Sequence, residues 1–414
     1  MAVLRPFKAV RPREDMAARV AALPYDVMTS AQAREMVKGN PYSFLHVDRA
    51  EIDLDPSVDI YSEEVYEKAA ANLKKLKEEG ILIQDEKPCF YIYRQIRKGK
   101  AQTGIVGCAS IDDYLENHIK KHELTRADKE ADRIHHVDTC DANTGPIFLT
   151  CSMSQEMKNL TEQWTKQHKP VYDFVAEDEI AHIVWIVDDA AVIEKMGTLF
   201  DGIPAFYIAD GHHRAASAVK VGQKRRAENP GYTGEEEFNF FLSVVFPYDE
   251  LTILPYNRVV KDLNGLDEKA FVGSLKFNFE LMLMPGFPCK PVEKHSIGMY
   301  TGGQWYHLRA WEDVYSGKNV QEQLDVAILQ EKVLSPILGI GDPRTDNRIS
   351  FVGGSHKAKE LEEMADATGG VAFVMYPTSM EDLMQIADEG GLMPPKSTWF
   401  EPKLRSGLFI HELK

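Results

Sequence analysis

The stretch Ala205 to Arg214 constrains the fold of this chain more than any other. It is an apolar run that ends in Asp-Gly-His-His-Arg and leads into an alanine-rich segment, Ala215 to Glu228. The apolar run holds β-forming residues and is typical of a strand buried on both faces, whereas the alanine-rich segment favours a helix that ends at Asn229. The sequence therefore predicts a strand, a glycine turn and a helix in direct succession.

Such a junction has the geometry of a phosphate-binding loop. Unpaired N–H groups and the positive end of the helix dipole meet at the start of the helix, and Gly211 lets the backbone approach a ligand closely. Asp210 can hold Mg²⁺, and the planar fork of Arg214 suits phosphate oxygens. The imidazoles of His212 and His213 stand between them. The alternative is an ordinary polar turn after a core strand.

Composition narrows the kinds of partner that we expect. The 414 residues include 64 acidic and 48 basic side chains, a net charge of −16, which disfavours non-specific binding to DNA or to anionic membranes. The five cysteines are widely spaced without a Cys-x-x-Cys pair, so neither a disulfide framework nor a zinc knuckle is expected. Neither a signal peptide nor a run of about 18 apolar residues is apparent. We expect a cytoplasmic protein that binds small molecules, with a homodimer as one possible assembly and with no nucleic acid and no membrane as partner.

Hydrophobic periodicity predicts a mixed α/β (α+β) chain of three segments. The predicted elements include helices at 31–37, capped by Ser30, and at 63–79, a hairpin of strands at 89–97 and 102–111, and strands at 238–246 and 251–260. A last helix at 380–388 is expected to be capped by Thr378 or Ser379 together with Glu381 or Asp382. The expected segments are 1–111 with helices and the hairpin, 112–262 with the phosphate-binding loop, and 263–414 as a C-terminal α/β domain.

The charged stretch from Asp112 to His136 has helical periodicity and contains His122 and Glu123. A helix of this kind usually lies on the surface, lined with opposite charges.

Two further stretches carry candidate anion-binding residues. Gly353-Gly354-Ser355 follows a predicted strand and precedes a helix, so it can hold an anion or simply reverse the chain. The segment from Met393 to Ser406 is stiffened by prolines and carries a set of phosphate or carboxylate donors: Lys396, Ser397, Thr398, Lys403 and Arg405. The alternative is an exposed basic tail, although Trp399 and Phe400 argue against full exposure.

Several motifs together resemble a large prokaryotic family, the domain of unknown function 1015, over essentially the whole chain. They are Arg5-Pro-Phe-Lys-Ala-Val-Arg-Pro12, Pro24-Tyr-Asp-Val27, Asn40-Pro-Tyr-Ser-Phe-Leu-His46, His122-Glu123, Asp210-Gly-His-His-Arg214, Asp342-Pro-Arg-Thr-Asp346 and Pro395-Lys-Ser-Thr398. Three of them, in the same order, are also similar to the archaeal ADP-dependent free serine kinase family: Glu after His, Asp-Gly-His-His-Arg, and the closing Pro-Lys-Ser-Thr.

The resemblance implies a ParB/sulfiredoxin-like nucleotide-binding core with additional N-terminal and C-terminal α/β segments. In that fold a Gly-x-His-Arg turn cradles nucleotide phosphates. Carried over by position, the catalytic residues are Glu123 as base, Asp210 and His212, with Asp210 also holding the metal. The nucleotide contacts are Gly211, His212, His213 and Arg214, and the substrate contacts are His122, Lys396, Ser397 and Thr398. The distance from Glu123 to Asp210 is longer than in the kinase, and the N-terminal part has no counterpart there, which leaves the acceptor open.

Three functions follow as hypotheses. The first is a kinase that uses Mg²⁺ and ADP or ATP to phosphorylate a free hydroxyl amino acid, with L-serine favoured, giving O-phosphoserine. The second is a metal-dependent phosphohydrolase, for which His135, His136 and Asp138 are the partial candidate ligands. The third is a non-catalytic nucleotide-binding protein of the ParB-like type. Sulfiredoxin activity is disfavoured because His212 stands where that enzyme has its reactive cysteine.

Overall fold

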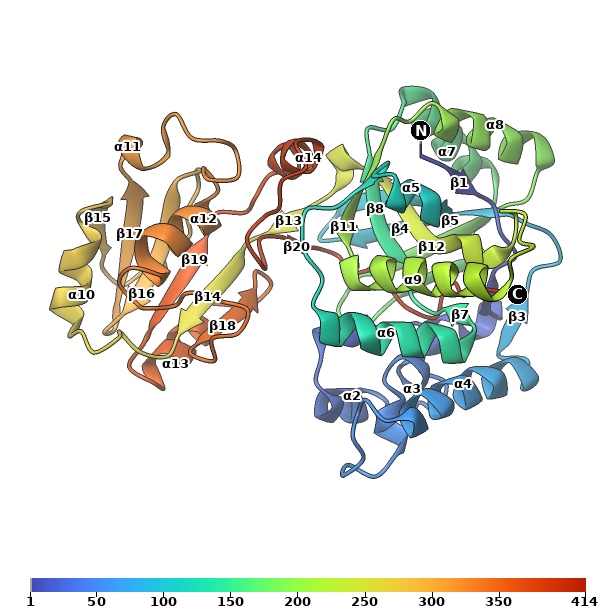
Figure 1. Ribbon diagram of the computed structural model, residues 1–414, viewed down its shortest axis with the longest axis horizontal. Helices are drawn as coiled ribbons and strands as arrows, with labels where there is room; N and C mark the ends of the chain where they lie inside the picture. The colour runs from blue at the N-terminus through green and yellow to red at the C-terminus, as the bar shows by residue number, and fades with distance from the viewer. Residues whose placement is uncertain (1) are drawn as a thin grey trace. The chain divides into compact units, whose positions relative to one another are not determined.

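The computed structural model describes residues 2–414 and shows a mixed α/β chain in two units (Figure 1). The first unit contains the chain up to Lys121, Thr125–Leu251 and Pro402–Lys414. The second contains His122–Leu124 and Thr252–Glu401. This division differs from the three segments expected from the sequence, because the hairpin expected in the first segment lies inside the sheet that carries the phosphate-binding loop.

The first unit is built on a nine-stranded mixed sheet with the order β6-β11-β8-β12-β5-β4-β10-β9, and β1 pairs with β5. Its strands are β1 Leu4–Arg5, β4 Phe90–Arg97, β5 Lys100–Ser110, β6 Ile119–Lys120, β8 Ile147–Cys151, β9 Tyr172–Val175, β10 Ala181–Val187, β11 Phe206–Asp210 and β12 Phe240–Pro247. Neighbouring strands run antiparallel except for the pairs β11 with β6 and β12 with β8. The predicted hairpin is confirmed as β4 and β5, joined by Lys98 and Gly99, whose φ angles of 50° and 78° are those of a two-residue hairpin turn.

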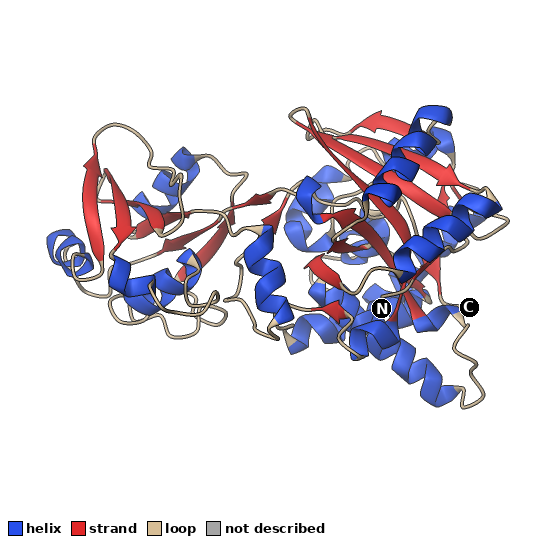
Figure 2. Cartoon of the chain, turned by 90° about the horizontal axis from the view of Figure 1, so that it is seen from above, coloured by secondary structure: helices blue, strands red, loops and turns tan. Residues whose placement is uncertain are grey.

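Helices pack beside this sheet, as Figure 2 shows in blue and red. They include α5 Ile111–Leu115, α6 Ala127–Cys140, α7 Gln155–Gln167, α8 Ala190–Asp201 and α9 His212–Glu228. The N-terminal helices α1 Ala17–Val20, α2 Ser30–Met36, α3 Leu45–Asp48 and α4 Glu63–Glu78 share a second apolar cluster that also includes Ile410 near the C-terminus. The unit also contains two short antiparallel sheets of two strands each: β2 Val10–Pro12 with β3 Leu82–Gln84, and β7 Ala142–Asn143 with β21 His411–Glu412.

The stretch 112–136 is not one helix, so that prediction is wrong. It forms α5, the short strand β6 and the first part of α6, and the chain turns after α5 at Asn117, whose φ is 62°. Nor is α6 a solvated surface helix. It lies between α4 and α9 (Figure 1), and this packing buries Asp132, Arg133 and His136. The charged and polar residues at helical spacing therefore include side chains that are buried inside the unit as well as side chains that face water.

Helix caps were predicted with mixed success. The N-cap of α2 is Thr29 rather than Ser30, because the Thr29 side chain accepts from the Gln32 N–H and the Gln32 side chain accepts in return from the Thr29 N–H. In the second unit, Ser379 caps α14 (Met380–Asp388) with Asp382, one of the predicted pairs.

The second unit is built on an antiparallel six-stranded sheet in the order β15-β17-β16-β19-β14-β18. The strands are β14 Tyr256–Val260, β15 Phe279–Met284, β16 Ser296–Thr301, β17 Gln304–Ala310, β18 Ile349–Gly353 and β19 Val371–Met375. Its other helices are α10 Glu268–Leu275, α11 Glu312–Tyr315, α12 Asp325–Leu329 and α13 Ala358–Asp366. The predicted strand at 251–260 is divided at Pro255 into β14 and the short strand β13 Ile253–Leu254, which pairs with β20 Trp399–Phe400.

The last thirteen residues, Pro402–Lys414, belong to the first unit. Lys403 and Arg405 are buried there, and Phe409 packs against the rings of Tyr91 and Tyr93. The alternative of an exposed basic tail is therefore wrong for these residues.

All five cysteines are free thiols, and four of them are buried. Among residues 2–414, no helix is long and apolar enough to cross a lipid bilayer.

Candidate functional site

The predicted strand–glycine–helix turn is present in the first unit. Residues 206–209 of β11 are buried, as expected for a strand covered on both faces, and the strand ends at Asp210. Gly211 follows with φ of 93°, in the left-handed region that favours glycine, and α9 begins at His212. A helix of 17 residues thus directs its unpaired N–H groups toward the end of the strand.

Asp210 is the negative centre of this turn. Its Oδ1 accepts from the Gly211 N–H at 3.0 Å, its Oδ2 accepts from Lys403 Nζ at 3.1 Å, and Arg214 Nη2 lies 4.0 Å from Oδ2. Burial favours the protonated carboxyl, but the charges of Lys403 and Arg214 outweigh it and hold the pKa of Asp210 well below its ordinary value. Asp210 is therefore ionised at neutral pH.

The guanidinium of Arg214 lies between two glycines. A Cβ built on Gly211 would stand 3.1 Å from Nε and Nη2 of Arg214, and a Cβ on Gly145 would stand 3.6 Å from Nη1. Nη1 donates to the Pro146 carbonyl at 2.5 Å. Nε is buried and has no hydrogen-bond partner among residues 2–414. Nη1 of the guanidinium is thus held by the Pro146 carbonyl, while Nε is a buried donor without an acceptor among residues 2–414.

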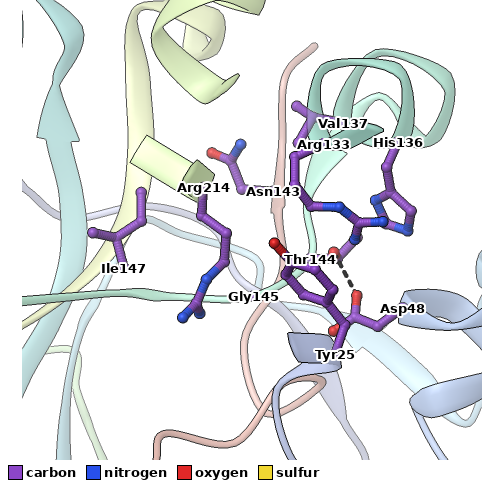
Figure 3. A pocket seen from close by; sticks show the side chains of 10 residues that line it. All are labelled: Tyr25, Asp48, Arg133, His136, Val137, Asn143, Thr144, Gly145, Ile147 and Arg214. Carbon is purple, nitrogen blue, oxygen red and sulfur yellow. Dashed lines mark hydrogen bonds between the residues drawn. The ribbon is translucent and has the colours of Figure 1, made fainter. Parts of the chain in front are cut away.

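Behind Arg214 is a cavity of about 20 Å³, room for about one water molecule (Figure 3). Figure 3 shows Tyr25 between Arg214 and Arg133, and the Arg133 guanidinium lies 4.0 Å from the centre of the Tyr25 ring. On the far side, Thr144 donates to Asp48 at 2.8 Å. These contacts support the Arg214 side of the turn, and the cavity is too small for a nucleotide.

The two histidines of the turn differ in their surroundings. His213 Nε2 accepts a hydrogen bond from the Arg126 N–H at 3.0 Å, so this ring fixes the start of α6. In that bond Nε2 is the acceptor nitrogen of the ring. His212 is buried at the first position of α9.

The other predicted site residues belong to the second unit, and two of them lie in the irregular segment that follows β6. His122 is buried there and Glu123 is half-buried. The His122 carbonyl accepts from the Met393 N–H at 2.7 Å. This contact ties the segment that carries Glu123 to the stretch before Pro394.

The closing Pro-Lys-Ser-Thr segment is an ordered loop of the same unit. Lys396 has a φ of 58°, and Arg258 Nη2 donates to its carbonyl at 3.0 Å. Ser397 is buried, and its carbonyl accepts from the Thr378 hydroxyl. These backbone contacts hold Lys396, Ser397 and Thr398 in a defined conformation.

Lys403 was not predicted as a site residue, although it is one of the phosphate or carboxylate donors noted in the segment from Met393 to Ser406. Lys403 lies 193 positions from Asp210 in the chain, and only folding brings them together. The Pro146 carbonyl, which accepts from Arg214, was not predicted either, because every residue has a backbone carbonyl and the sequence does not indicate which one will be used.

Comparisons with known proteins identify a family and several distant structural matches. The family model described as "Protein of unknown function (DUF1015)" matches residues 4–327. A comparison with curated proteins found no match.

The solved structures that resemble the chain share little sequence with it. One is free serine kinase in complex with AMP, with 15% identity over 74% of this chain and 91% of that chain and a TM-score of 0.38. Another is a conserved hypothetical protein from Pyrococcus furiosus, with 14% identity over 76% and 96% and a TM-score of 0.36. A third is SbnI with C-terminal truncation from Staphylococcus aureus, with 12% identity over 73% and 85% and a TM-score of 0.38.

Proposed function

The chain belongs to the DUF1015 family, which is described only as a family of unknown function, and we propose that it is a phosphotransferase. In this proposal the turn from Asp210 to Arg214 binds the phosphates of an adenine nucleotide, ADP or ATP. The phosphoryl group passes to the hydroxyl of a free amino acid, with L-serine favoured.

The observation that carries the proposal is the buried Nε–H of Arg214, which has no acceptor among residues 2–414. Leaving a buried donor unsatisfied costs about 1–3 kcal/mol, so such a donor in a folded protein calls for an explanation. A phosphate oxygen is the acceptor that an arginine fork and a helix N-terminus bind best.

The local charge supports the same ligand. Lys403 and Arg214 face the carboxylate of Asp210, so these three side chains carry an excess of one positive charge. This excess stands out in a chain with a net charge of −16. The positive end of the α9 dipole adds to it.

Magnesium fits this arrangement as a companion of the nucleotide. A single carboxylate together with substrate phosphates is a usual way for proteins to hold Mg²⁺, and Asp210 is the carboxylate available at the turn. The ion would compete with Lys403 for Asp210, and when bound it would neutralise part of the phosphate charge.

For the transfer itself we propose Glu123 as general base. The substrate oxygen forms a bond to phosphorus, the bond from phosphorus to the leaving phosphate oxygen breaks, and the hydroxyl proton passes to a carboxylate. Asp210 is a poorer base because Lys403 and Arg214 already stabilise its charged form. We propose His122, Lys396, Ser397 and Thr398 as contacts of the acceptor, with His212 beside the nucleotide.

The phosphohydrolase hypothesis loses its candidate ligands. His136 is buried with Nε2 on the Val47 carbonyl, Asp138 pairs with Lys224 and Arg225, and the His135 ring stacks on Tyr66. Their polar groups serve three separate contacts, which does not favour a shared metal ion.

Nucleotide titration of the Arg214→Ala variant tests the proposal. We expect affinity for ADP or ATP, measured by calorimetry with and without Mg²⁺, to fall by roughly 10²- to 10³-fold, as for the loss of one preorganised charged donor. Arg344→Ala is the matched control, since Arg344 is an exposed arginine that also pairs with an aspartate, Asp342. Unchanged nucleotide affinity in Arg214→Ala would remove the assignment.

Phosphate transfer distinguishes the remaining functions. A kinase releases the shortened nucleotide only when an amino acid such as serine is added, whereas a phosphohydrolase releases phosphate without it. Nucleotide binding with no turnover under either condition would favour the non-catalytic alternative.

A further inference from the structure

The second unit holds a cavity of about 250 Å³ at its own strand–glycine–helix turn. This is the turn from β18 through Gly353 and Gly354 to α13, which the sequence predicted without deciding between an anion site and a plain reversal. The cavity is lined by Pro255, Asn257, Cys289, Lys290, Pro291, Gly354, His356, Ala358, Leu361, Val374, Met375 and Pro377. The last seven of these twelve residues follow residue 327, where the match to the DUF1015 model ends.

The cavity lies where two neighbouring strands separate. β14 pairs with β19 only over Arg258–Val260. One residue earlier, Asn257 still pairs with β18, while Val374 and Met375 of β19 pair with β16. At this point the Asn257 side chain replaces the missing backbone contact, since its Oδ1 accepts from the Met375 N–H at 3.2 Å.

That contact leaves the other half of the Asn257 amide as a donor with no acceptor. Because Oδ1 must accept from a backbone N–H, the Nδ2 amino group is the free end. Asn257 is only 3% exposed, it lines the cavity, and nothing among residues 2–414 accepts a hydrogen bond from Nδ2. Because Asn257 lines the cavity, a ligand acceptor or a water molecule there can satisfy this amino group.

The other lining residues indicate the charge of a ligand that would fit the cavity. None of the twelve residues is acidic, although acidic residues outnumber basic ones in the chain. Lys290 is exposed, and Ala358 stands at the positive end of α13, a helix of nine residues. His356 is also exposed, and its Nδ1 is bonded to Glu360.

The wall made by Leu361, Val374 and Met375 is apolar and buried. One amide donor, one lysine and a helix end suit a single carboxylate better than a phosphate dianion, which needs more donors. The volume lies just below the range of drug-sized pockets, which limits the apolar part of the ligand to a short chain or one ring.

We propose that this cavity is a second ligand site that binds a small monocarboxylate, with its carboxylate on Asn257 Nδ2 and its apolar body against Leu361 and Val374. All twelve lining residues belong to the second unit, whereas residues 210–214 belong to the first, and the proposal does not depend on the proposed phosphotransfer.

Calorimetric titration of the full chain with isovalerate and phenylacetate tests the proposal, with isovaleramide and inorganic phosphate as reference probes. We expect saturable binding of the carboxylates, with the amide and phosphate at least roughly 10-fold weaker, because each lacks half of the recognised chemistry. Absence of saturable carboxylate binding at millimolar concentration would overturn the proposal, and so would phosphate binding of equal strength.

Asn257→Asp is the sharpest variant, because it keeps the acceptor for the Met375 N–H and replaces only the donor. We expect carboxylate affinity to fall by roughly 10- to 100-fold, as for the loss of a hydrogen bond to a charged group. The matched control is Asn319→Asp, since the exposed Asn319 also accepts a backbone N–H, that of Glu322, through Oδ1 at 2.9 Å. Equal carboxylate affinity in the two variants would overturn the assignment.

Leu361→Phe provides a second variant if Asn257→Asp does not fold. The larger side chain fills the apolar part of the cavity, so carboxylate binding should fall at least roughly 10-fold. Unchanged binding there would contradict the proposed position of the apolar body. Arg214→Ala should bind the carboxylates like the parent, which separates this test from that of the proposed function.

Discussion

The turn at Asp210 in the first unit and the turn at Gly353 in the second have the same local order of strand, glycine and helix, but they are lined by different side chains. Each joins a strand to a helix through glycine. The first is filled by charged side chains, and the cavity beside Arg214 measures only about 20 Å³. The second has an apolar wall, no acidic lining residue and a cavity of about 250 Å³.

The difference comes from what the rest of the chain brings to each turn. The C-terminal segment places Lys403 against Asp210, and the strand β8 follows the Pro146 carbonyl that holds Arg214. Around the second turn, the separation of β14 from β19 leaves the Asn257 side chain as the bridge. Both turns join a strand to a helix through glycine, and long-range contacts determine which side chains surround each of them.

The largest effect that we expect separates chemistry from binding at the first turn. Glu123→Gln should lower the rate of phosphoryl transfer by about 10²- to 10⁴-fold, because it removes the proton acceptor and very little volume. Nucleotide affinity and carboxylate binding by the second unit should both remain at the parent level. Product formation and calorimetry measure these quantities, with Glu177→Gln as an exposed control. A variant that still phosphorylates serine at the parent rate would mean that Glu123 is not the base.

Replacing a glycine in each turn tests whether the two turns work differently. Gly211→Ala forces a residue with a Cβ to adopt a φ of 93° and places that carbon 3.1 Å from Arg214 Nε. We expect a loss of unfolding free energy of about 2 kcal/mol, together with weaker nucleotide binding.

Gly354→Ala is the matched change in the second turn, where the new Cβ would stand 2.5 Å from the Pro255 carbonyl oxygen. It should weaken carboxylate binding and leave nucleotide affinity unchanged, as measured by calorimetry and denaturant unfolding. If Gly354→Ala weakened nucleotide binding as much as Gly211→Ala does, the contrast between the turns would fail.

Lys403→Met tests the charge balance of the first turn through its pH dependence. The pKa of Asp210 is lowered in the folded protein, so this carboxylate contributes stability above its ordinary value of 3.8 and loses the contribution as pH falls below it. Removing Lys403 should cost about 1–2 kcal/mol at pH 7, since Asp210 is partly exposed and keeps Arg214. The difference between parent and variant should shrink below pH 4 in urea unfolding curves. A difference that stays constant with pH would contradict the ion pair as its source.

Asp325→Asn should show the opposite pH dependence in the second unit. Burial raises the pKa of Asp325 to about 8, so the folded protein retains a proton that the unfolded chain loses, and stability falls as pH rises from 3.8 to 8. The amide cannot ionise, so the variant should be more stable than the parent by roughly 5 kcal/mol at pH 8 and no more stable at pH 4. Thermal unfolding at the two pH values measures this, and a variant that is less stable at pH 8 would show that the charged form is stabilised.

Local sequence was sufficient to predict the elements that carry both turns. The strand before Asp210, the glycine turn, the helix after it and the β4–β5 hairpin all follow from side-chain preferences and glycine conformation within a few residues. The same local information gave a wrong prediction for residues 112–136, which are not a single surface helix. Charged residues at helical spacing give the same pattern whether water or buried partners surround them.

The sequence by itself determined the positions of two candidate anion turns, because each is set by a short run of β-forming residues followed by glycine. Only the tertiary structure decided what each turn contains. Lys403 reaches Asp210 across 193 positions, and Asn257 reaches Met375 across 118. Such pairs leave no periodic signal in the chain, since they arise from the order in which strands pair and from where that pairing stops.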